Sequence, residues 1–583
     1  MKPSSLLLIF LVVPITLFSQ SLTAIDRYLR IDASSHDPIY TTYSATISRT
    51  TFPEAIAYKM DYYTDSSPVT FTGNKSGKMY SFWKIDDTLV MKTGEYYKKP
   101  VVIYSFPDMM VMEYQPVKEI HVRETFFVYS FSMALVDMEI TNTGALGHDV
   151  SVFPVLDFGN DSAEVSTFDN HAGGFLAERL VRHNELTTSR SNEIQRPENF
   201  TEFFTASPKI SGYDNGLSSP GDSRLLQMAG SSSRPIIDSI KPIDTFARFL
   251  MFHQARFVRP HETISFRYIR GVRRKDEKTE SLVSEACKLK SCLMKTFFED
   301  NLMLFANVPK TMFDRPQDKM IYISALNLSR VSMFPAFAPF VYNFFSSVKN
   351  QLPDSLKYRQ LWKDAPGLMG YIYVDRNSAD NAFRLLTDYL DQKKPLTFSV
   401  TEAGKGKISS AIPVYNLIGL QLYKQSGDKK FLRETYVTGV KFVNLLIRNN
   451  DPGSEMNYAI AALLSAEENC LSWMAKELGR TAESLEWSKK AQAVSPVKEG
   501  NMNQLKDSSL ILNYLNYYCM KNSGSPDEAA ELAGKIISCV SAQLSKTHDF
   551  YEFYNLQDDS GYGITDYFPD SIIAKLLIEE NVK

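Results

Sequence analysis

Tryptophan and cysteine are both scarce in this sequence, with 4 and 5 residues among 583. The cysteines form no Cys-x-x-Cys pair and have no histidine beside them, so a zinc site is not expected. A chain of this length does not need disulfides for stability. We expect most of the thiols to be free and buried, with at most one or two bridges among Cys287, Cys292, Cys470, Cys519 and Cys539.

The sequence also lacks an excess of charge of either sign. Lys+Arg 64 against Asp+Glu 67 leaves a net charge of −3, which provides no strong field for binding nucleic acid. The commonest motifs for phosphate, dinucleotide, zinc-protease and serine-hydrolase chemistry are absent: the chain contains no GxxxxGK[ST], GxGxxG, HExxH or GxSxG. We therefore expect no metal, no cofactor and no nucleic-acid partner.

Long apolar runs are missing beyond the N-terminus, where none approaches the ~20 residues of a membrane-spanning helix. Residues 1–24 contain one lysine, an apolar run from Leu6 to Phe18 and then small and polar residues. This layout is that of a secretory signal peptide, and its apolar run is too short to span a bilayer comfortably. We expect a periplasmic or extracellular protein without a membrane span.

The spacing of apolar residues divides the remaining chain into two halves. Within 25–271 the period is two, most clearly along residues 134–141, as in a half-buried strand. A second apolar run, 150–156, follows within hairpin distance, and residues 264–269 repeat the alternation. Many such strands predict an antiparallel β-sandwich. The weaker pattern between residues 159 and 242 predicts loops and insertions on this sandwich.

Beyond the sandwich the period becomes 3.6. Residues 272–300 form a charged, capped helical stretch that could connect the halves, and 301–583 is predicted to be nearly all helix. Asp428 is placed to begin one helix, Gly479 to end another, and Ser525-Pro526 to begin a third with Ser525 as its cap. With connections near ~5 residues, this half has room for about a dozen helices but few long loops.

Three stretches carry a family resemblance: RETFFVYSFSMALVDMEITNTG with HDVSVFPVLDFG, the helix pair at 412–451, and FYEFYNLQDDSGYG at 550–563. Together they resemble the six-hairpin glycosidases, especially glycoside hydrolase family 63-like α-glucosidases and oligosaccharide glucosidases. The resemblance implies that the sandwich is followed by an (α/α) toroid of helical hairpins over 301–583, shortened and degenerate in its barrel. It also implies an oligosaccharide or glycan as the binding partner.

On this resemblance Glu552 is the catalytic base, Tyr551 and Tyr554 are wall residues, and Asn555 is an orienting residue. The alternative is that the aromatic residues belong to a strand or turn packed on the barrel and that Glu552 is simply exposed. Inversion needs a second carboxyl group ~6.5–9.5 Å from the base, leaving room for the attacking water.

The general acid has no single match in the sequence. Asp451 and Glu455 are the carboxylates of the corresponding segment, 450–458, and Asn457 could occupy the acid position as a non-ionisable replacement. Asp451-Pro452-Gly453 is also a plain turn.

The sugar-binding residues of the family are only partly present. Its Trp-Asp pair appears here as Tyr373-Val374-Asp375, so Asp375 would survive without a stacking tryptophan. Trp362, Trp473 and Trp487 have the spacings of helix core. Three functions stay open: inverting hydrolysis of α-linked oligosaccharides, a catalytically inactive glycosidase-like protein that binds a glycan or a partner, and a non-carbohydrate scaffold or lipid-facing envelope protein. The sequence does not determine the oligomeric state.

Overall fold

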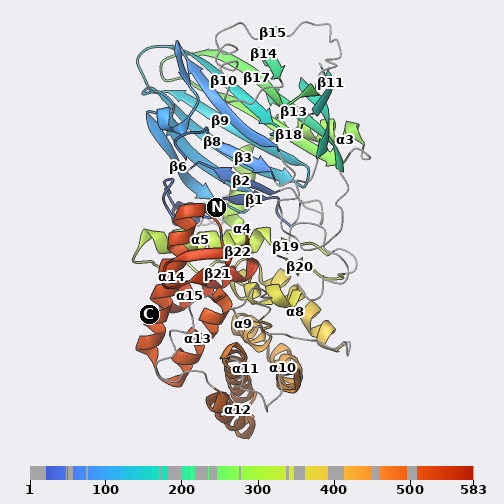
Figure 1. Cartoon of the computed structure of the whole chain (residues 1–583), viewed down its shortest axis with the longest axis vertical. Helices are drawn as coiled ribbons and strands as arrows, with labels where there is room; N and C mark the ends of the chain where they lie inside the picture. The colour runs from blue at the N-terminus through green and yellow to red at the C-terminus, as the bar shows by residue number, and fades with distance from the viewer. Residues whose placement is uncertain are drawn as a thin grey trace, which may run out of the picture.

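The structure is a computed structural model in which an antiparallel β-sandwich precedes a helical half, and this confirms the predicted fold class (Figure 1). It describes residues 22–47, 49, 57–62, 64–73, 77–159, 161, 163–169, 173–181, 198–208, 210–216, 234–235, 246–274, 278–336, 340–346, 361–391, 412–449, 458–494 and 508–581. Most of the predicted signal peptide, residues 1–21, lies outside the described residues.

Two antiparallel sheets form the sandwich. The first has the strand order β1 (Thr42–Ser44), β2 (Ala57–Asp61), β3 (Thr70–Gly73), β4 (Lys78–Ile85), β10 (His148–Asp157), β17 (Phe249–Val258), β14 (Gly212–Gly216) and β15 (Arg234–Pro235), with β5 (Thr88–Val90) also on β4. The second has the order β16 (Phe246–Ala247), β11 (Ala163–Asp169), β12 (Gly174–Val181), β13 (Glu198–Ser207), β18 (Thr263–Arg274), β9 (Met133–Asn142), β8 (Ile120–Ser130), β7 (Met109–Gln115) and β6 (Lys98–Ser105).

Two expectations about the sandwich are corrected. The runs in β9 and β10 do not form a hairpin: β9 pairs with β8 and β18 in one sheet, and β10 pairs with β4 and β17 in the other. Residues 143–147 therefore cross between the sheets. The region from 159 to 242 is more than loops, because β11 to β15 extend both sheets.

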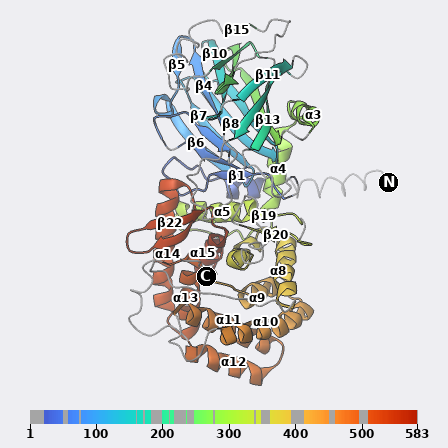
Figure 2. The same cartoon turned by 45° about the vertical axis from the view of Figure 1, so that its right-hand side comes forward.

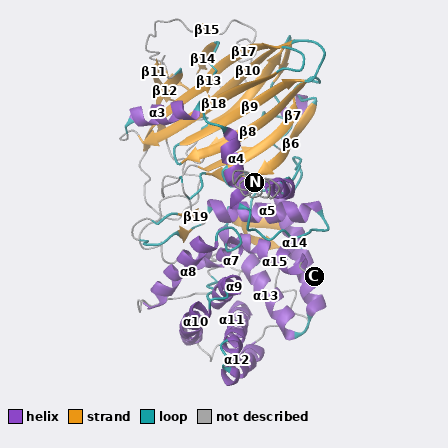
Figure 3. Ribbon diagram, turned by 180° about the vertical axis from the view of Figure 1, so that it is seen from behind, coloured by secondary structure: helices purple, strands orange, loops and turns teal. Residues whose placement is uncertain are grey.

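Aromatic side chains join the two sheets across the sandwich. Phe71 of β3 stacks on Phe126 of β8 with 3.9 Å between ring centroids, and Phe204 of β13 stacks on Phe252 of β17 at 4.6 Å. Stacks of this kind add to the hydrophobic effect of burying the rings. Seen from behind, the strands of the two large sheets form one block above most of the helices (Figure 3).

A buried ion-pair cluster also lies in the sandwich. Glu202 Oε1 is 2.6 Å from the Arg179 guanidinium, and Glu202 Oε2 is 2.8 Å from Nε of Arg270. The three side chains are at most 1% exposed. Burial alone would raise the pKa of Glu202, but the two guanidiniums hold it below its ordinary value.

The helical elements and two short antiparallel strand pairs complete the described part of the chain. They are η1 (Thr93–Glu95), α3 (Thr279–Leu289), α4 (Met294–Leu304), α5 (Pro316–Val331), η2 (Ala365–Gly367), α7 (Leu368–Tyr371), α8 (Arg376–Asp391), α9 (Asn416–Ser426), α10 (Lys429–Asn449), α11 (Tyr458–Glu477), α12 (Thr481–Val494), α13 (Leu510–Ser523), α14 (Pro526–Thr547), η4 (Phe568–Ile572), α15 (Ile573–Asn581), β19 (Met333–Phe334) with β20 (Phe344–Phe345), and β21 (Tyr551–Asn555) with β22 (Ser560–Thr565).

Local signals fix several helix ends. Asp428 Oδ1 accepts hydrogen bonds from the amides of Lys430 and Phe431, so it caps α10 as predicted. Gly479 has φ +76° just beyond α11, the left-handed conformation expected of a glycine stop. Pro526 begins α14 as predicted, but the Ser525 side chain makes no capping hydrogen bond.

Residues near the N-terminus connect the two halves. The Tyr40 hydroxyl donates to Asp566 at 2.6 Å, and Nδ1 of His548 is 2.9 Å from the carbonyl oxygen of Ile39. Lys59 forms an ion pair with Asp549. One hydrophobic cluster continues from the sandwich into the helices. The β21–β22 hairpin lies at this junction (Figures 1 and 2).

All five cysteines are free thiols, which confirms the expectation for most of them. Cys470, Cys519 and Cys539 are buried, and Cys287 and Cys292 are half-buried. Within the described ranges, no helix combines the length and the apolar character needed to cross a membrane.

Candidate functional site

Glu552 projects from a β-bulge in the β21–β22 hairpin. The ladder shifts between Tyr551 and Phe553, where β22 supplies one residue more than β21. Gly563 of β22 has φ +95°, and a Cβ built on it would lie 3.0 Å from Cβ of Glu552. Bulges redirect side chains, and glycine permits both the left-handed backbone and the close approach. The Glu552 side chain is directed inward and the residue is 5% exposed, in contrast to the exposed alternative.

A lysine neutralises the buried charge of Glu552. Nζ of Lys363, two residues before η2, is 2.6 Å from Oε1 of Glu552, and the two side chains are 12% and 6% exposed. The same ammonium lies 5.2 Å from the ring centroid of Tyr567. A buried carboxylate requires such compensation, because leaving it unpaired would cost several kcal/mol.

A second carboxyl group, not predicted from the sequence, lies beside this pair. Asp570 of η4 is fully buried, and its Oδ2 accepts a hydrogen bond from the Tyr554 hydroxyl at 2.8 Å. Burial raises the pKa of Asp570 well above its ordinary range, and the nearby negative charge of Glu552 raises it further, against the effect of the Tyr554 hydrogen bond.

The aromatic and amide residues around Glu552 shape the hairpin. Tyr554 is 1% exposed, and its oxygen also accepts a hydrogen bond from the Tyr551 amide at 3.0 Å. Burial raises the pKa of Tyr554 well above its ordinary value, so its hydroxyl remains a donor. Tyr551 is half-buried, and Asn555 Oδ1 accepts from the amide of Gln557 at 3.0 Å within the hairpin turn.

Asp375 lies at the start of α8. Its two oxygens accept hydrogen bonds from the Ser378 amide at 3.1 Å and from the Ser378 hydroxyl at 2.7 Å. Arg330 of α5 lies 3.5 Å from Oδ2. This is the arrangement of a helix cap held by an ion pair, so the carboxylate already has a structural role.

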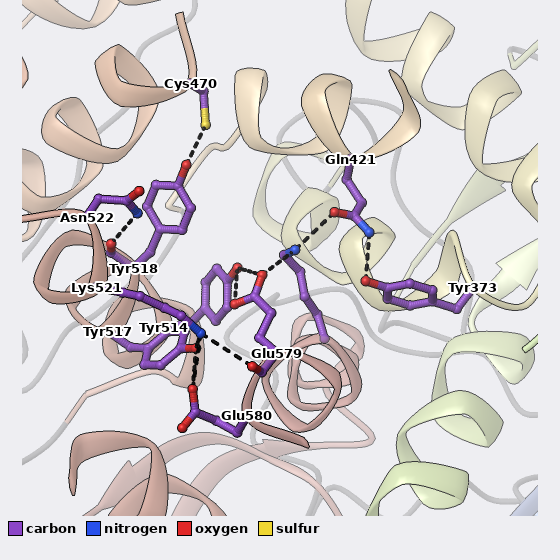
Figure 4. A network of polar contacts seen from close by, with 11 residues as sticks. Tyr373, Gln421, Cys470, Tyr514, Tyr517, Tyr518, Lys521, Asn522, Glu579 and Glu580 are labelled. Atoms are coloured by element: carbon purple, nitrogen blue, oxygen red, sulfur yellow. Dashed lines mark hydrogen bonds and ion pairs between the residues drawn. The ribbon is translucent and has the colours of Figure 1, made fainter. Parts of the chain in front are cut away.

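Tyr373 belongs to a separate polar network inside the helical half (Figure 4). Its hydroxyl accepts a hydrogen bond from Nε2 of Gln421 at 2.6 Å. Lys575 of α15 donates to the other amide atom of Gln421 at 3.0 Å and pairs with Glu579 at 2.7 Å. The structure therefore does not bring Tyr373 and Asp375 together with Glu552 through hydrogen bonds.

The remaining candidates divide into two groups. Asp451, Glu455 and the alternative Asn457 lie outside the described residues. Trp362 and Trp487 are 3% and 8% exposed, as expected of helix core.

The cluster around Glu552 therefore contains two carboxyl groups in different environments. Glu552 is compensated by an ammonium, whereas Asp570 has only the Tyr554 hydroxyl as its hydrogen-bond donor within the described structure. Such a difference in environment separates the protonation states of two neighbouring acids. In the described part of the chain, no group of three His, Cys, Asp or Glu side chains is arranged to hold a metal ion.

No protein-family model matches the sequence, and no curated protein matches it. Similar solved structures include a bacterial glucoamylase in complex with acarbose, at 10% identity, covering 80% of this chain and 67% of that one with a TM-score of 0.42. A family GH92 inverting mannosidase from Bacteroides thetaiotaomicron has 9% identity, coverages of 95% and 85% and a TM-score of 0.40. A GH92 α-mannosidase from the same organism has 9% identity, covers 94% of this chain and 83% of its own, and has a TM-score of 0.42.

At these identities and TM-scores the likenesses assign no activity to this chain.

Proposed function

We propose that this chain is a glycoside hydrolase that acts on α-linked oligosaccharides by inversion, with Glu552 as the base. The observation that carries the proposal is the buried Glu552 carboxylate, directed inward by a bulge, compensated by Lys363 and placed beside the second carboxyl group of Asp570. The proposal includes export to the periplasm or beyond, and a division into a sandwich at 25–271, a linker at 272–300 and a helical barrel at 301–583.

The chemistry requires two proton transfers. Glu552 would take a proton from a water molecule as the water oxygen attacks the anomeric carbon, and a general acid would protonate the leaving oxygen. Asp570 cannot be that acid by direct contact, because it is fully buried. We assign the acid to Asp451 or Glu455, with Tyr551 as a wall residue of the site.

A second candidate function, glycan binding without cleavage, is favoured by one observation. Glu552 is only 5% exposed and already paired with Lys363, so little of its side chain is open to an attacking water molecule. A protein of this kind would bind an oligosaccharide and leave the glycosidic bond intact.

The deciding experiment measures hydrolysis of a panel of α-linked gluco- and manno-oligosaccharides by the wild-type protein and by Glu552→Gln. Removing a general base lowers kcat by about 10²–10⁴-fold, so a loss of that size is expected. The Asp451→Asn and Glu455→Gln variants identify the acid. Glu486→Gln on α12, at an exposed carboxylate paired only with Lys490, is the control.

Hydrolysis that persists in Glu552→Gln would exclude Glu552 as the base. Calorimetric binding of an oligosaccharide by a wild-type protein that cleaves none of the panel would instead support the second candidate.

A further inference from the structure

A chain of hydrogen bonds links Asp570 to both sides of Glu552. The Tyr554 hydroxyl donates to Oδ2 of Asp570 at 2.8 Å and accepts from the Tyr551 amide at 3.0 Å. Because Tyr551 precedes Glu552 and Tyr554 follows it by two residues, this hydroxyl ties together the ends of the β21 segment that lies opposite the bulge. The position of Glu552 therefore depends on where Asp570 holds Tyr554.

The surroundings of Asp570 are those of a neutral acid. The residue is fully buried, and its Oδ1 has no hydrogen-bond partner among the described residues. The nearby cation, Lys363, is already paired with Glu552. An ionised Asp570 would place a second negative charge in this site without a cation of its own, which is strongly unfavourable in a buried position.

The other ionisable groups on elements packed against η4 have contacts of their own. Arg330 of α5 contacts Asp375 and Tyr371, and Lys575 of α15 contacts Gln421 and Glu579. Tyr514 of α13 donates to Glu579, and Asp364 is buried at the start of η2. Glu552 and Tyr554 are the groups that act on the protonation of Asp570.

We propose that Asp570 is a positioning residue for Glu552: a neutral carboxylic acid that holds the Tyr554 hydroxyl and thereby fixes the segment of β21 from which Glu552 projects. This inference rests on the proposed role of Glu552 as the base. Loss of the Asp570 proton puts a second negative charge beside Glu552, so activity falls on the alkaline side.

The first test compares pH profiles of kcat for the wild-type protein, Asp570→Asn and Tyr554→Phe. Asp570→Asn cannot ionise, and we expect a kcat lowered about two- to tenfold near neutral pH, with the alkaline decline moved to higher pH. Tyr554→Phe cuts the link to the β21 segment and lowers kcat about tenfold with little change in KM. An alkaline decline unchanged in Asp570→Asn, or a wild-type kcat in Tyr554→Phe, would overturn the proposal.

The second test does not require activity. An acid that stays protonated in the folded protein destabilises the fold as pH rises from its unfolded-state pKa, about 3.9, to its folded-state pKa. We therefore expect the Tm of the wild-type protein to fall relative to that of Asp570→Asn as pH rises above the unfolded-state value of about 3.9. Asp558→Asn, at a fully exposed turn, is the control and should follow the wild-type curve.

Parallel Tm curves for the wild-type protein and Asp570→Asn would show that Asp570 is ionised and would overturn the inference. A wild-type protein that hydrolyses no member of the panel would instead contradict the proposed hydrolase function. Failure of the proposed function and failure of the inference about Asp570 are therefore distinguishable.

Discussion

Three buried carboxyl groups of this chain differ in the cations beside them. Glu202 lies between two guanidiniums, Glu552 pairs with one ammonium, and Asp570 accepts a hydrogen bond from a neutral hydroxyl. The expected protonation follows the number of compensating charges: the pKa of Glu202 is held low, while that of Asp570 is raised. Similar depth of burial therefore leads to opposite charge states.

Replacing Glu202 by glutamine should destabilise the protein by about 3–5 kcal/mol, because two buried guanidiniums would then share a neutral amide. Urea-induced unfolding of Glu202→Gln against wild type measures this difference. Asp65→Asn is the matched control, since its ion pair with Lys99 is more than half exposed and such pairs contribute about 0–1 kcal/mol. A Glu202→Gln variant as stable as the control would show that this cluster is not needed for stability.

At the scale of elements, the local signals were predictable and the long-range contacts were not. The helix begun by Asp428 follows from a 3.6 period and a cap, both of which are local in sequence. The placement of β9 and β10 in different sheets depends on their pairing with β18 and β17, which lie far along the chain. The hairpin was predicted only from the short connection between the two strands, and this prediction was wrong.

The candidate site shows the same division. The segment around Glu552 carries the resemblance in its own residues and could be identified from them. Lys363 comes to Glu552 from just before η2 and Asp570 from η4, and no spacing within their own segments indicates that they lie near Glu552. The signal that could have drawn attention to Asp570 is an acid in the mostly apolar run from Tyr567 to Ile573, in which Ser571 is the other small polar residue.

The β21–β22 hairpin should depend on Gly563. In Gly563→Ala a methyl group would meet Cβ of Glu552 at 3.0 Å and the Phe553 ring at 3.1 Å, on a backbone with φ +95°. Overpacking and left-handed strain together should cost about 2–5 kcal/mol. Gly427→Ala, with φ +66° and open space around it, separates the two effects and should cost about 1–2 kcal/mol. Equal losses of unfolding free energy in both variants would mean that the contact with Glu552 contributes nothing.

At the scale of the molecule, the two halves share one hydrophobic cluster and a polar junction. His548 is buried in this junction, between the Ile39 carbonyl and the Tyr62 ring, whose centroid is 5.5 Å away. Burial lowers the pKa of His548 to about 4, with the Lys59 charge acting in the same direction and the Ile39 hydrogen bond opposing it.

This histidine should make the protein sensitive to acid. Its folded-state pKa lies below the unfolded-state value of about 6.5, so its stabilising effect is complete above pH 6.5 and is lost as pH falls toward 4. The loss amounts to about 3 kcal/mol. His548→Asn does not titrate and tolerates the left-handed backbone at this position, φ +58°. Denaturant unfolding at several pH values should give a shallower acid dependence for His548→Asn, and identical slopes would contradict this assignment.

The junction has a consequence for synthesis of the chain on the ribosome. Ile39 and Tyr40 meet partners 509 and 526 residues further along the chain. The later strands of the sandwich can pair once β18 has been translated, but the segment around Tyr40 must wait for residues 548–566. Domains generally fold as units in the order of their translation. Here the early residues of the sandwich would reach their final place only after residues 548–566 have been made, and they stay open to proteases and chaperones until then.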